Sequence, residues 1–515
     1  MSPIRGLVVL SVAAAAALST LVLHAAQTPV DDPAAQFQIG TQLYDAARYR
    51  EAMAAFDSAT HSDDHGLATR ARKSKVRAAL RIAEFYTALR EAELLNAGAV
   101  PDAESLTLRG DAQWASGQFD EADGSYRQAL VTVPESTRAR FGLARSLVTH
   151  SRLAEALAEA QIVAGQAPKD AEIHALVGLI HERLHNYEDA AAAFERYIAL
   201  LPERAPKEDN PMAAIFQGKV RLLRAFKGRV PMQIEGEQNR SYRVPFKLVD
   251  RKIVVQGRVN RTGVEFVLDT GSERTGISDQ TARRAGIGAI TSTLTAGVGI
   301  PSLRRLDMGR ADSIEIGSLR MRNVPIAIRG AVRNALPRWQ RESLSPLAMG
   351  LSVVIDYQRR EITLARSLPQ DEAQADFVLP MRMNRLPLVR GLLNSTHPAY
   401  FVVDTGGELI SISAETANAL AMTPSRRIPL RVFGMSGMDA DAFLLPGVNL
   451  DFDEIEYRNV GLAVLNLRAP SVLLGFQVGG IVGHRFLSEY RVSMDVARSE
   501  LRLVKFATPV LAGSR

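Results

Sequence analysis

The stretch Val264-Glu265-Phe266-Val267-Leu268-Asp269-Thr270-Gly271-Ser272 returns in altered form as Ala399-Tyr400-Phe401-Val402-Val403-Asp404-Thr405-Gly406-Gly407. Each copy is an apolar run typical of a buried strand, and each ends in Asp-Thr-Gly. A glutamate follows both copies at the same distance, as Glu273 and Glu408, and an Ile-Ser pair comes next. This shared context indicates two related units rather than an accidental tripeptide.

A second pair of landmarks extends the duplication. Residues 351–364 and 490–503 both read as β-hairpins with alternating apolar and polar positions. Their aspartates, Asp356 and Asp495, lie 87 and 91 positions after the aspartates of the two Asp-Thr-Gly motifs. We interpret these two aspartates as structural hydrogen-bonding residues. The C-terminal half is therefore predicted to be two β-rich lobes, at 240–367 and 376–507.

Composition limits the classes of protein that fit. The chain has 515 residues, of which 46% are hydrophobic, enough for two or three domains with cores. The net charge is +6, but the charges are mixed, which argues against nucleic-acid binding. Cysteine is absent, which excludes disulfides, thiolate catalysis and cysteine-bound metals.

Residues 1–26 have the pattern of an export signal. Arg5 precedes an apolar stretch from Leu7 to Leu23, and small residues follow at a cleavage site. The alternative is an uncleaved membrane anchor, since the stretch approaches the length of a span. Either way we expect an exported protein, of the bacterial periplasm, with no later transmembrane segment.

Residues 33–228 are predicted to be helical and repetitive. The period is 34 residues, and a helix at 213–226 is expected to close the array. A degenerate repeat fits near residues 70–100. Gly110, Ala144, Gly178 and, in an earlier copy, Gly40 hold the small position where two helices of one repeat touch. Positions that recur with this period are Pro134, Pro168 and Pro202; Phe119, Leu153 and Tyr187; and Ala122, Ala156 and Ala190. The region resembles the tetratricopeptide repeat family, which implies an all-α solenoid with a groove for a peptide or protein partner.

His181-Glu182-Arg183-Leu184-His185 fits the zinc motif H-E-x-x-H, in which two histidines share one helix face. The motif lies inside a helical repeat, where His181 is expected to help pack a helix pair. Repeats rarely supply the braced cleft that such a zinc needs. We therefore predict no metal site.

The two lobes resemble the aspartic peptidases, and most closely the bacterial retropepsin-like group, over about residues 240–507. The resemblance implies an all-β, double-lobed acid-protease fold in which Asp269 and Asp404 are the catalytic carboxylates. It also implies an active-site support, in which the threonines brace the loops and the glycines admit backbone amides to the carboxylates. The supporting residues are Thr270, Gly271, Ser272, Thr405, Gly406 and Gly407.

Two carboxylates about 3 Å apart share one proton and activate a water for attack on a peptide bond. The resemblance thus implies an endopeptidase with a peptide or protein substrate and no cofactor. Two alternatives stay open: the lobes have lost catalysis and serve as an envelope scaffold, or lobes pair between chains.

Flaps are expected at Ala296–Ile300 and Phe433–Met438, although ordinary hairpin turns fit both stretches equally well. Lobe two has the family's apolar-apolar-Gly at Ile481-Val482-Gly483. In lobe one the nearest match is Ala348-Met349-Gly350, which predicts a shortened connection. Gly407 replaces Ser272 and so removes a hydroxyl available to the carboxylate.

Overall fold

The computed structural model describes residues 32–97, 101–201, 211–237, 240–299, 302–330, 336–369, 374–421, 428–434 and 437–508. The chain forms two compact units, one ending at Ala112 and the other beginning at Gln113. The proposed export segment at 1–26 lies outside the described residues. Within the described ranges, no helix combines the length and apolar character needed to cross a membrane.

The first unit consists of antiparallel helix pairs. Two of its helices begin at capping aspartates, because the side chains of Asp32 and Asp64 accept backbone N–H groups of the first turn. Gly40 lies against the ring of Phe56, as expected for the small position of a repeat. The helices are α2 (Pro33–Asp45), α3 (Tyr49–Ala59), α4 (His65–Arg81), α5 (Phe85–Leu95) and α6 (Ala103–Ala115), the last of which crosses into the second unit. The pair α4 and α5 is the degenerate repeat.

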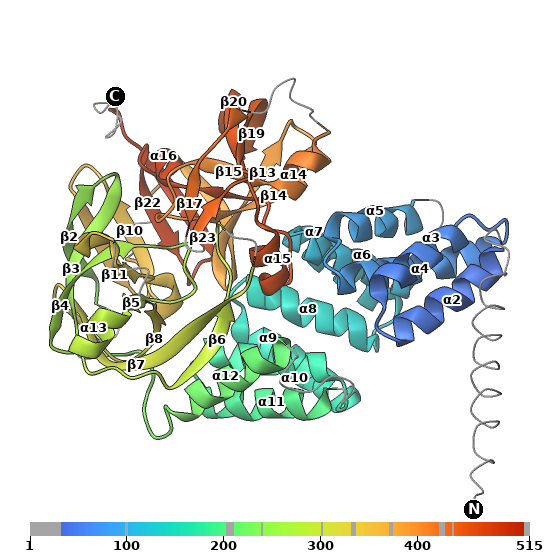
Figure 1. Cartoon of the computed structure of the whole chain (residues 1–515), viewed down its shortest axis with the longest axis horizontal. Helices are drawn as coiled ribbons and strands as arrows, with labels where there is room; N and C mark the ends of the chain where they lie inside the picture. Colours follow the sequence, from blue (N-terminus) through green and yellow to red (C-terminus); the bar gives the residue numbers. More distant parts are fainter. Residues whose placement is uncertain are drawn as a thin grey trace, which may run out of the picture. The chain divides into compact units, whose positions relative to one another are not determined.

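The second unit begins with further helices of the repeats (Figure 1). Its helices are α7 (Phe119–Thr132), α8 (Thr137–Thr149), α9 (Leu153–Gln166), α10 (Ala171–Arg183) and α11 (Tyr187–Leu200). The turn inside each repeat holds one residue in the left-handed region: Gly117 (φ 84°), Ser151 (φ 58°) and His185 (φ 62°). These three positions are 34 residues apart, so the backbone repeats with the period of the sequence.

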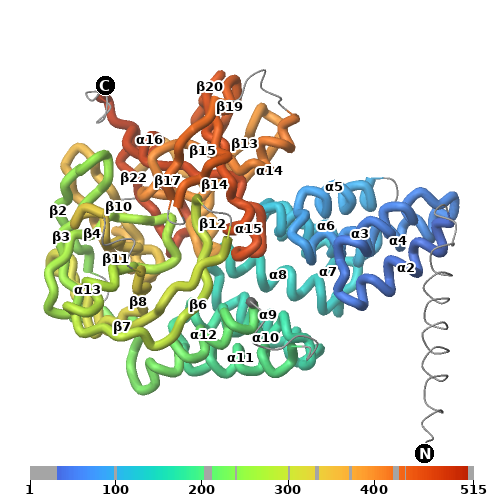
Figure 2. The backbone as a smooth tube through the Cα atoms, viewed as in Figure 1, coloured from blue at the N-terminus to red at the C-terminus, as the bar shows by residue number. Residues whose placement is uncertain are grey.

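Helix α12 (Pro211–Arg224) closes the array and joins it to the strands. Phe216 stacks against Phe194 and Tyr197 of α11, which hides the last apolar face. On its other side Gly218 approaches the carbonyl of Ser292 in β6 (Thr291–Thr295), so closely that a Cβ would lie 2.5 Å from the oxygen. Figure 2 shows the tube of α12 running beside β6.

The strands form two lobes of matching order, which confirms the predicted fold class. After β1 (Gln233–Ile234), lobe one contains β2 (Tyr242–Val249), β3 (Lys252–Val259), β4 (Thr262–Leu268), β5 (Gly276–Ser278), α13 (Asp279–Arg284), β6, β7 (Arg304–Ile316), β8 (Leu319–Arg329), η2 (Arg338–Gln340), β9 (Glu342–Leu344), η3 (Leu347–Met349), β10 (Ser352–Asp356) and β11 (Glu361–Ala365). Lobe two contains β12 (Phe377–Asn384), β13 (Leu386–Leu393), β14 (His397–Val403), β15 (Ile410–Ser413), α14 (Ala414–Ala419), β16 (Ile428–Pro429), β17 (Val432–Gly434), β18 (Gly437–Asp439), β19 (Phe443–Phe452), β20 (Ile455–Leu465), α15 (Arg468–Leu474), β21 (Gly480–Val482), α16 (His484–Leu487), β22 (Tyr490–Asp495) and β23 (Glu500–Lys505).

The two lobes share one antiparallel sheet. Its strands run in the order β2, β11, β10, β22, β23 and β12, three from each lobe. At its centre Val354 pairs with Ser493, and each residue lies two positions before the hairpin aspartate of its own lobe. The sheet therefore has a pseudo-twofold axis between these two residues. In this structure the lobes pair within one chain.

The repeats of the second unit dock on the lobes through their turns. The amide of Gln477 donates to Ala115 O at 2.7 Å, and Ser499 Oγ donates to His150 O at 3.0 Å. Arg183 Nη1 donates to Met383 O at 2.9 Å. Phe119 packs edge-on against Tyr400 within an apolar cluster that repeats and lobe two share. These helices are thus an integral part of the second unit.

We predict opposite effects for two helical glycines. A Cβ on Gly178 would lie 2.5 Å from the ring of Phe194, whereas a Cβ on Gly124 would meet nothing within 4 Å. Gly178→Ala should destabilise the protein by about 1–3 kcal/mol through overpacking. Gly124→Ala should stabilise it by up to about 1 kcal/mol through helix propensity. Thermal unfolding measures both changes, and equal shifts in the two variants would contradict the assigned repeat packing.

Candidate active site

Two threonines link the ends of β4 and β14. The Thr270 amide donates to Thr405 Oγ1 at 3.1 Å, and the Thr405 amide donates to Thr270 Oγ1 at 3.0 Å. Each hydroxyl donates in turn to the strand of the other lobe, Thr270 to Val403 O at 2.7 Å and Thr405 to Leu268 O at 2.8 Å. Both threonines are buried. The two Asp-Thr-Gly loops are therefore fixed to each other.

This link brings the two aspartates together. A Cβ on Gly406 would lie 3.0 Å from Oδ1 of Asp269 and 3.0 Å from Oδ1 of Asp404, so the two oxygens are at most twice that distance apart. A Cβ on Gly271 would overlap the carboxyl group of Asp404. Each lobe thus covers the other lobe's carboxylate with a glycine, because any side chain there would occupy the carboxylate's place.

The surroundings of Asp404 suit a carboxyl group that changes protonation. Burial raises its pKa above the ordinary value of an aspartate. The Gly406 amide, which donates to Oδ1 at 2.7 Å, opposes this rise, as do the charge of Lys252 and the amides of Gly407 and Gly271. Two neighbouring carboxyl groups under these conditions titrate as a coupled pair.

Ion pairs between the lobes explain the glutamate that follows both Asp-Thr-Gly motifs. Arg251, in the turn between β2 and β3, pairs with Glu408 at 2.5 Å. Arg385, in the corresponding turn between β12 and β13, pairs with Glu273 at 2.6 Å. Both arginines are in the left-handed region, with φ of 62° and 67°. Each lobe therefore holds the active-site loop of the other.

Lys252 breaks this symmetry. Its Nζ donates to the carbonyl oxygen of Gly406 at 2.5 Å, beside Asp404. The residue at the corresponding position of lobe two, directly after Arg385, is Leu386. Sequence reasoning missed this lysine, because it lies more than 150 positions before the loop that it contacts.

The expected glycine support of lobe one is wrong. Strand β21 runs parallel to β14, and β9 takes the corresponding place beside β4. Leu344 O accepts the Asp269 amide at 2.8 Å, just as Val482 O accepts the Asp404 amide at 3.0 Å. Gly350 instead ends η3 with φ 68°. The residue after Leu344 is Ser345, which therefore stands where lobe two has Gly483.

Ser345 keeps lobe one's loop attached despite its side chain. Its hydroxyl donates to Ser272 O at 2.5 Å, and its amide donates to Thr275 Oγ1 at 3.1 Å. The Ser272 hydroxyl donates to Arg274 O at 2.9 Å, so it serves the loop backbone rather than the carboxylate. At Gly407 a Cβ would lie 3.1 Å from Asp404 Oδ2, closer than side chains normally approach.

The hairpin aspartates have the structural surroundings that we expected. Asp356 Oδ1 accepts the amide of Arg359 at 2.9 Å, and Asp495 Oδ1 accepts the amide of Arg498 at 3.0 Å. Each aspartate therefore closes the turn of its own hairpin.

The two flap candidates meet at their glycines. Gly299 has φ 123° and Gly437 has φ 126°, and a Cβ on Gly299 would lie 2.5 Å from Gly437 O. A Cβ on Gly434 would overlap the carbonyl of Val298. Ile300, Met435 and Ser436 lie outside the described residues. These contacts between hairpins of different lobes distinguish the two stretches from ordinary turns.

The H-E-x-x-H segment does not form a helical pair of histidines. Helix α10 ends at Arg183, and His185 lies in the left-handed turn beyond it. Burial and the charge of Arg366 lower the pKa of His185 to about 4. Glu182, which the zinc motif would use as a base, forms ion pairs with Lys219 and Arg274.

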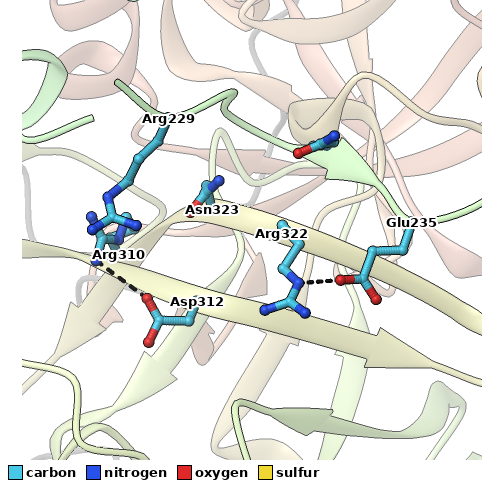
Figure 3. Close-up of a pocket in the computed structure, with 7 residues that line it drawn as sticks. Arg229, Glu235, Arg310, Asp312, Arg322 and Asn323 are labelled. Atoms are coloured by element: carbon cyan, nitrogen blue, oxygen red, sulfur yellow. Dashed lines mark hydrogen bonds and ion pairs between the residues drawn. The ribbon is translucent and has the colours of Figure 1, made fainter. Parts of the chain in front are cut away.

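A cavity of about 600 Å³ lies where the segment before lobe one meets β7 and β8 (Figure 3). Its arginines are largely neutralised, because Arg310 pairs with Asp312 and Arg322 pairs with Glu235. None of its lining residues belongs to the predicted site. They are Arg229, Gln233, Glu235, Arg310, Asp312, Arg322 and Asn323.

Comparison with known families finds matches in the repeats and in lobe one. Residues 255–351 match the family model described as aspartyl protease, and residues 107–171 and 144–205 match a tetratricopeptide repeat model. An Hsp70-Hsp90 organizing protein from Triticum aestivum is 29% identical over 100 residues. That match covers 19% of this chain and 17% of the relative, so the chain spans only a small part of it.

Some solved structures are similar to about a third of this chain. A thermophilic repeat protein from Thermus thermophilus is 16% identical with a TM-score of 0.30, over 34% of this chain and 93% of that one. MamA from Desulfovibrio magneticus is 20% identical with a TM-score of 0.25, over 31% of this chain and 85% of that one.

We predict that Thr270→Val destabilises the protein by about 2–4 kcal/mol, because it leaves Val403 O and the Thr405 amide buried without partners. Chemical unfolding measures the loss. Thr270→Ser, which keeps the hydroxyl, should retain most of the stability. Thr132→Val, at an exposed helical position, should change it little. Unchanged stability in Thr270→Val would show that the threonine link contributes nothing to folding.

Proposed function

We propose that this chain, which carries an aspartyl protease domain after tetratricopeptide repeats, is an exported endopeptidase with Asp269 and Asp404 as its catalytic pair. The observation that carries the proposal is the position of Gly406, where a single Cβ would lie 3.0 Å from a carboxylate oxygen of each lobe. Carboxyl groups in close proximity share one proton, and this is the arrangement that peptide hydrolysis by an activated water requires.

In the proposed reaction the ionised aspartate takes a proton from a water bound between the carboxyl groups, and the resulting hydroxide attacks the scissile carbonyl carbon. The protonated aspartate donates a hydrogen bond to the carbonyl oxygen as negative charge develops there. Collapse of the tetrahedral intermediate breaks the C–N bond, and the leaving nitrogen receives a proton from the pair. The threonine link keeps both groups in place throughout.

The flaps support a substrate that binds as an extended peptide. The contacts of Gly299 with Gly437 and of Gly434 with Val298 would have to separate for a chain to enter, and closure would then exclude water. Phe433 is 75% exposed on the lobe-two flap and is available to an apolar side chain. The repeats are proposed to bind a peptide or protein partner, and residues 1–26 to direct export to the periplasm.

We predict that Asp269→Asn and Asp404→Asn each lower the rate of peptide cleavage by at least about 100-fold, since each removes one half of the general acid–base pair. A peptide library digested at several acidic pH values, with detection by mass spectrometry, measures the rate. A metal chelator should leave the rate unchanged, because the proposed reaction uses carboxylates alone.

Asp453→Asn is the matched control, because Asp453 is an exposed turn residue of lobe two with φ 54°, which asparagine also adopts. It should cleave like the wild type. Undiminished cleavage by either active-site variant would refute the proposed mechanism. A wild type that binds library peptides without cutting them would indicate the scaffold alternative.

We predict that Lys252→Met moves the pH–rate profile to higher pH. The lysine charge favours the ionised form of Asp404 and so lowers the pKa of the pair; without it, the first proton leaves at higher pH. The acid limb of kcat/KM should shift upward, and Lys252→Arg should restore it. Lys247→Met, at an exposed position of β2, should leave the profile in place. An unshifted profile in Lys252→Met would rule out this electrostatic role.

A further inference from the structure

Glu182 joins three parts of the second unit. It comes from α10 of the last repeat, forms an ion pair with Lys219 of α12, and accepts a hydrogen bond from Arg274 Nη2 at 3.2 Å. Arg274 belongs to the active-site loop of lobe one, five residues after Asp269. Only 15% of the Glu182 side chain is exposed, so this contact is largely shielded from water.

The charge balance of this cluster makes Glu182 indispensable to it. Burial alone would raise the pKa of Glu182, but Lys219 and Arg274 outweigh this and lower it to about 2. The carboxylate therefore stays ionised through the acidic range in which the proposed reaction runs. Glu182 neutralises both Lys219 of α12 and Arg274 of the loop. Without it, these two positive charges would lie close together with no negative partner.

Arg274 transmits this contact to the active-site loop. Its carbonyl oxygen accepts the Ser272 hydroxyl at 2.9 Å, and Ser272 O accepts the Ser345 hydroxyl at 2.5 Å. On the other side of the loop, Glu273 is paired with Arg385 of lobe two. The loop segment 272–274 is thus held between lobe two and the last repeat.

Lobe two has no equivalent arrangement in its described residues. The position that corresponds to Arg274 is Leu409, which is 40% exposed. Helix α12, which supplies Lys219, also contacts the flap side of lobe one, where Arg221 Nε donates to Thr291 Oγ1 at 3.0 Å. Both of these contacts are made with lobe one, whereas Arg183, next to Glu182 in α10, donates to Met383 O of lobe two.

We propose that Glu182 is a positioning residue that orients the active-site loop of lobe one through Arg274, which makes the last repeat part of the catalytic scaffold. This inference rests on the proposed peptidase function. A purely structural role for the buried cluster is the competing explanation, and the two differ in which partner of Glu182 matters for the rate.

The test compares Arg274→Met with Lys219→Met in the full chain. Arg274→Met keeps the Glu182–Lys219 pair but frees the loop, so kcat should fall about 10-fold while KM changes less than about twofold. Lys219→Met keeps the Glu182–Arg274 contact, so kcat should remain near that of the wild type even if the melting temperature falls. Glu182→Gln should match Arg274→Met, and the double variant should be no slower than either single one.

Glu172→Gln is the control. Glu172 lies in the same helix as Glu182, and the substitution removes only its exposed ion pair with Arg138 of α8. A wild-type kcat in Arg274→Met, or an equal loss in Lys219→Met, would overturn the positioning role while leaving the peptidase proposal intact. A wild type that cleaves nothing would overturn both. If Glu182→Gln does not fold, the result for Arg274→Met is sufficient by itself. That variant keeps the ion pair of Glu182 with Lys219, so neither charge is left without a partner.

Discussion

Four hydrogen bonds made by Thr270 and Thr405 hold the centre of the catalytic half. They tie the end of each lobe's apolar strand to the backbone of the other lobe, in a place from which water is excluded. Buried polar groups of this kind are costly to leave unpaired, so the hydrogen bonds strongly favour this relative position of the two loops. The approach of Asp269 to Asp404, and the room that Gly271 and Gly406 provide, follow from that position.

Around this symmetric centre the two lobes have diverged, which a single chain permits and identical subunits would not. Lys252 faces the loop of lobe two, whereas Leu386 stands at the matching place. Ser345 supports lobe one by hydrogen bonding, whereas lobe two uses Gly483. The two aspartates therefore experience different charges and different supports, although their loops follow one backbone pattern.

Local periodicity explains what could be predicted from the sequence. The 34-residue period predicted the helix pairs, and the apolar strands before Asp-Thr-Gly predicted two lobes, because each signal lies within a short window. The ion pairs of Arg251 with Glu408 and of Arg385 with Glu273 join residues more than 100 positions apart. The glutamate that follows each Asp-Thr-Gly indicated a shared role, but the sequence did not identify the arginine partners.

The structure overturns one expectation and shows that a second motif lacks the geometry it presumes. Gly350 was expected to support the loop of lobe one, but Ser345, which donates its own hydrogen bond, fills that role. The pattern H-E-x-x-H presumes a continuous helix, which ends before His185. In both cases the surrounding chain, rather than the residue types, decided the outcome.

The docking of the repeats through their turns also constrains how this architecture can change over generations. The turns at Gly117, Ser151 and His185 recur at one interval, and residues beside them contact Gln477, Ser499 and Met383 of the lobes. Duplicating or deleting a helix pair between these turns would displace every later turn from the residue of the lobes that it contacts. Lineages descended from such a protein would therefore gain or lose repeats at the amino-terminal end of the array, while the three nearest the lobes stayed fixed in number.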